Sequence, residues 1–285
     1  MRIGIIGAGK VGVALAHVLR TKGFDVVAVA SRRQASLDAA KTYIGPDCFY
    51  TLDNSRAVEM ADVVAVATQD REIKTVAVQI AAGPGRLDGK LFFHTSGAHA
   101  ASELSPLEQK GALLGSLHPL QTFPDIDAGI KNLSGTYIFI EGNGETLPVL
   151  ESIASAIGAQ AVPIASEHKV LYHLSAVFVC NLLAALLYAG EGVMKRIGIE
   201  LAPFYPIIRA TLANIEAKGP LLSLTGPVVR GDAGTVASHI EAIGDMPLHE
   251  KVYRDLSLAA LEMARQRGTL TEEQASALRG LLEGR

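Results

Sequence analysis

The chain opens with Met1-Arg-Ile-Gly-Ile-Ile-Gly-Ala-Gly-Lys-Val-Gly12, and this stretch decides the fold. The apolar run 3–6 is followed by glycines spaced G-x-G-x-x-G and then by helix-forming residues. A strand, a glycine turn and a helix in this order hold a dinucleotide pyrophosphate at the helix N-terminus. Gly7 permits the tight turn, Gly9 lets the backbone approach the phosphates, and Gly12 lets the helix pack closely on the strand. The predicted dinucleotide contacts are Gly7, Gly9, Lys10, Val11 and Gly12, and the alternative is a purely structural glycine turn.

Beyond this turn, strand-like and helix-like segments alternate, which is typical of a doubly wound parallel sheet. Strands are expected at 2–6, 25–30, 48–50, 62–67, 90–94, 113–117, 136–140 and 160–164. Helices are expected between them at 11–22, 34–43, 71–81, 102–110 and 147–157. The later helices are expected at 166–197, 202–218, 234–243, 247–267 and 271–283. The fold class is therefore α/β, with a nucleotide domain at 1–165 followed by an all-helical domain at 166–285.

Composition excludes several classes of protein. The 285 residues carry a net charge of −3 with scattered Lys and Arg, so we expect no nucleic-acid partner. Cys48 and Cys180 are too few for a disulfide framework or a zinc site, so we expect no metal and a reducing, cytoplasmic compartment.

One apolar segment, 174–190, carries no charged residue and lies at the lower edge of the length that crosses a bilayer. Its polar residues include Asn181, and His173 and Glu191 bound it. We interpret the segment as a helix buried within the protein, at the interface of a homodimer formed by the C-terminal helices. We do not interpret it as a membrane span.

The end of the second expected strand indicates which dinucleotide binds. In NAD-binding folds of this type, an Asp or Glu about 20 residues beyond the glycine turn accepts hydrogen bonds from the adenosine ribose. Here the strand ends in Ser31-Arg32-Arg33, without an acid. A carboxylate would repel a 2′-phosphate, whereas a hydroxyl and two guanidinium groups suit one. Ser31, Arg32 and Arg33 therefore predict NADP(H). The alternative is NAD(H), with both arginines as solvated charges.

Polar residues follow three further strands. Because ligands of open parallel sheets bind at the carboxyl ends of the strands, these residues are candidates for the site. The expected contacts to the cofactor ribose and nicotinamide are Thr68 and Gln69, and the expected contacts to substrate are Ser96, Gly97, His118 and Gln121. The alternative is that these groups only satisfy the backbone of their loops.

The helix expected from residue 166 carries Lys169, Tyr172 and His173 in its first turns. Lys169 and His173 are four residues apart and share one face, with Tyr172 beside them. A partly desolvated lysine there could donate a proton or stabilise an oxyanion. The alternative is that Lys169 is a surface charge and His173 a hydrogen-bonded core residue.

The segment Thr225-Gly-Pro-Val-Val-Arg-Gly-Asp232 precedes another helix. An arginine and free amides ahead of a helix can bind an anion, so Arg230 could hold a substrate carboxylate with help from Thr225. The alternative is that Arg230 pairs with Asp232, which caps the helix.

Several of these motifs together resemble a bacterial Rossmann-like group whose helical C-terminal domain has no assigned function. The motifs are those at 7–12, 31–32, 94–98, 115–123, 169–173, 181 and 224–232. The chain is more distantly similar to pyrroline-5-carboxylate reductase, β-hydroxyacid dehydrogenases and prephenate dehydrogenase. The resemblance implies a Rossmann domain and a helical domain that dimerises and completes the active site. It also implies that Lys169 matches a catalytic lysine, that His173 replaces an asparagine, and that the loop around Arg230 corresponds to a carboxylate site.

The resulting hypothesis is an NADP(H)-dependent oxidoreductase that exchanges hydride with a small hydroxy/keto or amino/imino acid. Lys169 or His118 would move the proton or stabilise the oxyanion, His173 and Tyr172 would orient it, and Arg230 would anchor the carboxylate. The sequence leaves open a non-catalytic NADP(H) sensor or interaction protein, and a deazaflavin as the hydride partner.

Overall fold

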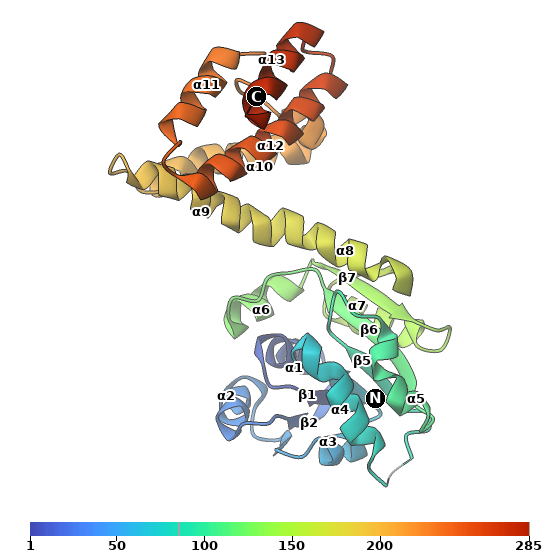
Figure 1. The fold of residues 1–285 in the computed structure, drawn as a ribbon. Coiled ribbons are helices and arrows are strands. Elements are labelled where there is room, and N and C mark those ends of the chain that lie inside the picture. The colour runs from blue at the N-terminus through green and yellow to red at the C-terminus, as the bar shows by residue number, and fades with distance from the viewer. Residues whose placement is uncertain (85, 285) are drawn as a thin grey trace. The chain divides into compact units, whose positions relative to one another are not determined.

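The computed structural model describes residues 1–84 and 86–284 and divides into two compact units, Met1–Val177 and Phe178–Arg285. The first is an α/β unit and the second is helical (Figure 1). The sequence places the boundary at residue 166, where strand signals end. The structure keeps the next turns of helix with the α/β unit, because Lys169 is buried there and only 1% exposed.

The α/β unit contains one eight-stranded sheet in the order β3-β2-β1-β4-β5-β6-β7-β8. Its strands are β1 Arg2–Ile6, β2 Asp25–Ala30, β3 Phe49–Thr51, β4 Val63–Val66, β5 Leu91–His94, β6 Leu113–Pro119, β7 Tyr137–Gly142 and β8 Gln160–Pro163. All neighbours pair in parallel except β6 and β7, which are antiparallel. The predicted doubly wound α/β fold is therefore confirmed, with the two last strands extending the sheet from an antiparallel step.

Helices accompany this sheet along the chain. They are α1 Lys10–Thr21, α2 Gln34–Ile44, α3 Asn54–Met60, α4 Ile73–Ala81, α5 Ser105–Glu108, α6 Ile126–Leu133, α7 Leu147–Ala156 and α8 Lys169–Ala176. The sequence reading missed α3 and α6. Both are short helices with an aspartate cap: Asp53 accepts a hydrogen bond from the Ser55 amide, and Asp125 accepts one from the Ala128 amide.

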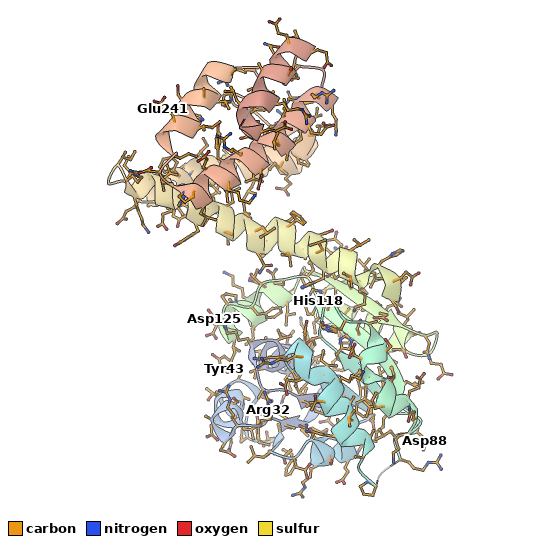
Figure 2. The ribbon with its side chains drawn as sticks, viewed as in Figure 1. Arg32, Tyr43, Asp88, His118, Asp125 and Glu241 are labelled. Carbon is orange, nitrogen blue, oxygen red and sulfur yellow. The ribbon has the colours of Figure 1, made fainter. Side chains whose placement is uncertain are left out.

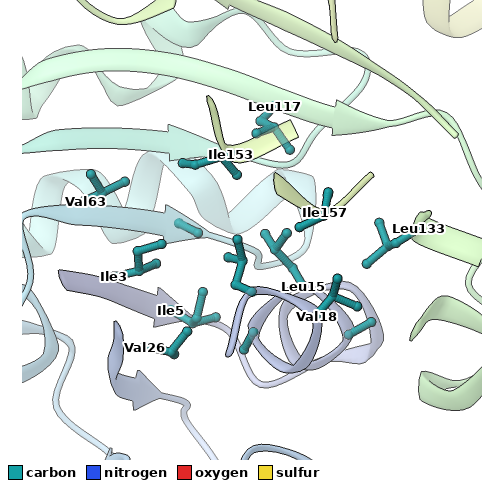
Figure 3. Packing of buried hydrophobic residues seen from close by; sticks show 14 of the residues in the cluster. Ile3, Ile5, Leu15, Val18, Val26, Val63, Leu117, Leu133, Ile153 and Ile157 are labelled. Carbon is teal, nitrogen blue, oxygen red and sulfur yellow. The ribbon is translucent and has the colours of Figure 1, made fainter. Parts of the chain in front are cut away.

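Alternating apolar residues give the sheet a core on each face. Ile3 and Ile5 of β1 belong to one cluster, which also takes Leu15 of α1 (Figure 3). Ile6 belongs to the cluster on the other face, together with Ile73 of α4. Because successive side chains of a strand point to opposite faces, strands that are apolar throughout need helices on both sides. This burial fixes the strand ends that carry the candidate site.

The C-terminal unit contains α9 Leu182–Lys195, α10 Tyr205–Ser223, α11 Ala233–Ala242, α12 Pro247–Gln266 and α13 Glu272–Glu283. Its core joins Val236 of α11, Leu261 of α12 and Leu278 of α13. Gly219, with φ of 76°, interrupts α10 directly before Pro220. The interruption is expected at this point because proline cannot donate the helical hydrogen bond.

One helix is long and apolar enough to cross a membrane by length and composition, within the described part of the chain. It runs over Ser166–Lys195 and includes α8, a π-helical turn at Val177–Asn181 and α9. The side chains of Phe178 and Val179 in that turn are 60% and 73% exposed in the single chain. The expected burial of this segment therefore does not occur within one copy.

Candidate functional site

The glycine turn between β1 and α1 has the geometry that its spacing predicts. Gly7 has φ of 109°, and a Cβ at this position would lie 2.5 Å from the Ala67 carbonyl oxygen. A Cβ on Gly12 would collide with the carbonyl oxygen of Gly7. Side chains are therefore excluded at both positions by backbone packing, not only by backbone conformation.

The space beside Gly9 is open. A Cβ built on Gly9 meets no described heavy atom within 4 Å. Gly9 is also the N-cap of α1, where the described residues provide no side-chain cap and the first turn holds no acid. The free amides and the positive end of the helix dipole thus face a space that a phosphate group can occupy.

This turn borders a cavity of about 470 Å³ at the carboxyl ends of β1, β2 and β4. Its lining includes seven of the predicted cofactor residues: Gly7, Gly9, Ser31, Arg32, Arg33, Thr68 and Gln69. The other three predicted cofactor residues, Lys10, Val11 and Gly12, lie in the first turn of α1 and are not part of this lining. The structure therefore brings together the glycine turn, the arginine pair and the end of β4.

Guanidinium groups gather at this cavity. Arg32, labelled in Figure 2, forms an ion pair with Glu72, with 2.9 Å between Nη1 and Oε2. Arg33 and Arg71 also line the cavity, and Nε of Arg71 lies 3.5 Å from Oε1 of Glu72. The sequence did not single out Arg71, which belongs to the 3₁₀ turn Asp70–Glu72 after β4, far along the chain from the arginine pair. Three guanidinium groups at one cavity suit a multiply charged anion.

The hydroxyl of Thr68 is an unsatisfied polar group at the same cavity. Its Oγ1 is buried and has no hydrogen-bond partner among the described residues. A buried hydroxyl without a partner costs about 1–3 kcal/mol, so such a group usually has a ligand or water. The residues of the cavity therefore fit a dinucleotide that hydrogen-bonds at the end of β4.

A second group of polar residues lies around Lys169, at the ends of β5 and β6. The Lys169 ammonium donates to Ser116 Oγ at 2.5 Å and to the Ser96 carbonyl oxygen at 3.4 Å. It also lies 3.4 Å from Oε2 of Glu141, a residue of β7 with a buried side chain. Lys169 is therefore a buried member of an ion pair and not a surface charge.

Glu141 is held by several donors. Its carboxylate accepts hydrogen bonds from the Ala101 amide at 3.0 Å, from Ser116 Oγ at 3.2 Å and from Ser166 Oγ at 2.6 Å. The sequence reading missed Glu141 and Ser116. Glu141 follows an apolar strand and resembles an exposed strand end. Only the antiparallel pairing of β7 with β6, which sets Glu141 opposite Ser116, brings it to Lys169.

His118, Tyr172 and His173 meet around Gly97. Nδ1 of His118 lies 2.6 Å from the Tyr172 hydroxyl. A Cβ on Gly97 would lie 2.8 Å from Nε2 of His118 and 2.8 Å from Nδ1 of His173, so only glycine fits between the two rings. Nδ1 of His173 is buried and has no partner among the described residues. Beside Gly97, a buried imidazole nitrogen of His173 thus has no hydrogen-bond partner in the described part of the chain.

Burial sets the protonation of these groups. Burial, followed by the charges of Lys169 and His173, lowers the pKa of His118 to about 4. Burial also lowers the pKa of Lys169, which Glu141 and then Asp70 oppose. The pKa of the Tyr172 phenol is raised by burial. At neutral pH, His118 is therefore an uncharged imidazole beside an uncharged phenol.

His94 and Ser96 have structural contacts. Nε2 of His94 lies 3.0 Å from the Ala100 carbonyl oxygen, and the Ser96 amide donates to Nδ1 of His94 at 3.2 Å. The Ser96 hydroxyl lies 3.1 Å from Nδ1 of His99, the same nitrogen that faces Asp70 at 3.5 Å. A catalytic triad uses both ring nitrogens, so this trio does not activate Ser96 as a nucleophile.

Three predicted substrate residues make none of these contacts. Gln121 is exposed, and its amide oxygen accepts from the Thr122 amide at 2.8 Å. Thr225 and Arg230 are exposed residues of the C-terminal unit. Asp232 caps α11 by accepting a hydrogen bond from the Thr235 amide at 3.0 Å. The capping role expected of Asp232 is thus present, while a substrate role for the other three stays a prediction.

Two family models match the chain. Residues 1–119 match a Rossmann-like domain, and residues 136–260 match a domain of unknown function, DUF2520. No curated protein matches the chain.

Solved structures share the fold over nearly its whole length. A Bacteroides fragilis protein, BF3122, assigned as an NADP oxidoreductase, is 25% identical with a TM-score of 0.76, covering 90% of this chain and 96% of its own. Protein TM1727 from Thermotoga maritima is 24% identical with a TM-score of 0.71, covering 94% and 99%. A reductive aminase from Aspergillus terreus, in complex with NADPH and ethyl-5-oxohexanoate, is 18% identical with a TM-score of 0.62, covering 99% and 92%. As the resemblance implied, a Rossmann-like match is followed along the chain by a match to a domain of unknown function.

Proposed function

We propose that the protein is an NADP(H)-dependent oxidoreductase that acts on a small hydroxy/keto or amino/imino acid. The observation that carries this proposal is the open space beside Gly9, at the uncapped N-terminus of α1 and the border of an arginine-lined cavity. A helix N-terminus with free amides suits a pyrophosphate. The likeness to BF3122 and to a reductive aminase that binds NADPH supports the same class of cofactor.

NADP(H) is proposed over NAD(H) because of the charges at the cavity. Arg32, Arg33 and Arg71 line it, and Ser31 adds a hydroxyl. A 2′-phosphate can accept bidentate hydrogen bonds from a guanidinium group, whereas the ribose hydroxyl of NAD(H) lacks the charge. Glu72 also lines the cavity and holds Arg32 by an ion pair, which keeps that guanidinium at the cavity.

The bound nicotinamide would supply or accept a hydride, and residues of this chain would handle the proton. Lys169 and His118 are the proposed proton-moving groups. The contact of Lys169 with the Ser96 carbonyl is long, at 3.4 Å, so this N–H is the one most easily turned to a substrate atom. His173 and Tyr172 would orient the substrate beside Gly97, and Gln121, Thr225 and Arg230 remain proposed substrate contacts.

We further propose a cytoplasmic homodimer formed through the C-terminal helices. The long helix exposes the large apolar side chains of Phe178, Val179 and Tyr188, which are more stable when buried. A second copy of this chain is the proposed occupant. Val179→Arg should yield monomers in sedimentation velocity, whereas Val78→Arg, at an exposed apolar position of α4, should leave the dimer intact. A wild-type monomer, or a dimer unaffected by Val179→Arg, would contradict this assignment.

The function is tested by cofactor titration followed by a substrate screen. NADPH should bind more tightly than NADH to ligand-free protein, and Arg32→Ala or Arg71→Ala should weaken NADPH about tenfold or more without changing NADH. Arg56→Ala, away from the cavity lining, is the matched control. Keto, hydroxy and imino acids are then screened by NADPH absorbance with wild type and Lys169→Ala. The proposal is refuted if the protein binds neither NADPH nor NADH. Binding without any turnover identifies a non-catalytic sensor.

A further inference from the structure

The side chain of Lys169 is buried, and its ammonium group has almost no contact with water. Its side chain is 1% exposed, and its ammonium contacts the Ser116 hydroxyl, the Ser96 carbonyl and the Glu141 carboxylate. A buried ammonium that gives up its proton has to recover one through a neighbour. The Ser96 carbonyl cannot carry a proton, and Ser116 is itself fully buried.

Glu141 is the neighbour that reaches a second environment. It lines a cavity of about 380 Å³ together with Ser166, Asn143 and Glu108. Neither Lys169 nor Ser116 belongs to that lining, and none of these residues lines the cavity at the glycine turn. One carboxylate therefore contacts both the buried ammonium and a separate cavity.

We propose that Glu141 carries protons between this second cavity and Lys169, with the Ser116 hydroxyl as a bridge. The inference rests on the proposed function, because Lys169 needs a new proton only if it gives one to the reacting substrate. It assigns a residue that the sequence reading did not single out.

When the substrate is reduced, Lys169 gives one proton to the substrate atom and becomes a neutral amine. Glu141, now without a positive neighbour, takes one proton from water in the second cavity. That proton passes to the Ser116 oxygen while the Ser116 proton passes to the amine nitrogen. The ammonium, the hydroxyl and the carboxylate are then restored, and one proton has been taken from solvent. In the direction of oxidation, the same route releases one proton.

The contacts of Glu141 suit this role. The Ser116 hydroxyl accepts from Lys169 at 2.5 Å and lies 3.2 Å from Glu141 Oε2, so the three groups form a continuous chain. The Ala101 amide and the Ser166 hydroxyl hold the carboxylate in place from the cavity side. A residue needed only as a counter-ion would function equally well without a cavity beside it.

The first experiment compares a single turnover with steady-state turnover. At pH 6, Glu141→Gln should complete the first hydride transfer within about twofold of wild type, because Lys169 has taken up its proton before mixing. Steady-state turnover should fall by about tenfold or more, since reprotonation becomes limiting. Glu108→Gln, on the same cavity but not in contact with Lys169, should match wild type in both measurements. Equal losses in both phases of Glu141→Gln would overturn the proposal.

A second variant keeps the test valid if glutamine disturbs the ion pair. Glu141→Ala removes the carboxylate and enlarges the second cavity. Added formate buffer should raise steady-state turnover in proportion to its concentration, because formic acid can enter and replace the missing group. Absence of rescue in folded protein, or equal stimulation of wild type and variant, would contradict the route.

A third measurement needs no substrate. Lysine labelled at ¹³Cε reports the titration of Lys169, whose signal is identified by its loss in Lys169→Arg. The charges that raise the pKa of this ammonium are Glu141 of β7 and Asp70 of the 3₁₀ turn after β4, so Glu141→Gln should lower the pKa of Lys169. An unchanged titration would overturn the coupling. Wild-type protein that binds no NADPH would refute the proposed function instead, and the two failures are therefore distinguishable.

Discussion

The Tyr172 hydroxyl lies 2.6 Å from Nδ1 of His118, and this contact joins α8 to the end of β6. We assign the hydroxyl as the donor and Nδ1 as the acceptor of this hydrogen bond. Since burial lowers the pKa of His118 to about 4, the imidazole is neutral near pH 7 and carries its hydrogen on Nε2. The contact thus sets which nitrogen faces Gly97 as a donor.

Tyr172→Phe should remove the hydrogen bond that fixes His118 in its Nε2–H tautomer. The ¹⁵N shifts of His118 should change from one dominant tautomer to a mixture, and turnover should fall by about 10²-fold if His118 moves the proton. The loss of one hydrogen bond should cost only about 1 kcal/mol of unfolding free energy. Tyr137→Phe, at an exposed position of β7, is the control. Unaltered His118 shifts would refute the assigned donor.

Gly9→Ala and Gly12→Ala should separate cofactor binding from folding. Gly9 has open space beside it, so alanine there should leave the melting temperature nearly unchanged while lowering the affinity for NADPH about tenfold. Gly12→Ala collides with the Gly7 carbonyl and should lower both stability and binding. Calorimetry and nucleotide titration measure the two effects. If Gly9→Ala binds NADPH as wild type does, the phosphates do not lie beside Gly9.

Thr68→Val should act in opposite directions on stability and binding. Because Thr68 Oγ1 is buried without a partner among the described residues, replacing the hydroxyl by a methyl group should not lower the unfolding free energy of ligand-free protein and could raise it by about 1 kcal/mol. NADPH affinity should fall if the hydroxyl binds the cofactor. Denaturant unfolding and titration test this, and a destabilised apo variant would argue against an unsatisfied hydroxyl.

His94 should make stability depend on pH. Burial lowers the pKa of His94 from 6.5 to about 4, so the unfolded chain binds a proton between these values that the folded chain does not. Its contribution is therefore full above pH 6.5 and is lost as the pH falls toward 4, by about 3 kcal/mol in total. His94→Gln should reduce this slope in urea unfolding between pH 4.5 and 7. Because the pKa of His118 is also lowered to about 4, His118 should retain part of this pH dependence in the variant. An identical slope in both proteins would count against a buried neutral His94.

Local sequence determined most of the architecture. The run at Ile3–Ile6 and the glycines after it specify β1, its turn and α1, because apolar periodicity and glycine spacing act within a few residues. The same patterns do not predict the capped short helices α3 and α6, since these are too short to show a clear helical period. The fold and the glycine turn could thus be predicted, along with Arg32 and Arg33 at one cavity.

Tertiary structure decided how the charges of the site are paired. Lys169 looked like a group offered to a cleft, yet its ammonium is buried against Glu141, which the antiparallel pairing of β7 with β6 sets opposite Ser116. Arg71 follows β4 and Arg32 follows β2, and the sheet brings both to the same cavity. Strand pairing between segments far apart in the chain brings such residues together. The spacing of residues within one segment does not determine this pairing, because the register of a strand depends on the packing of the whole sheet.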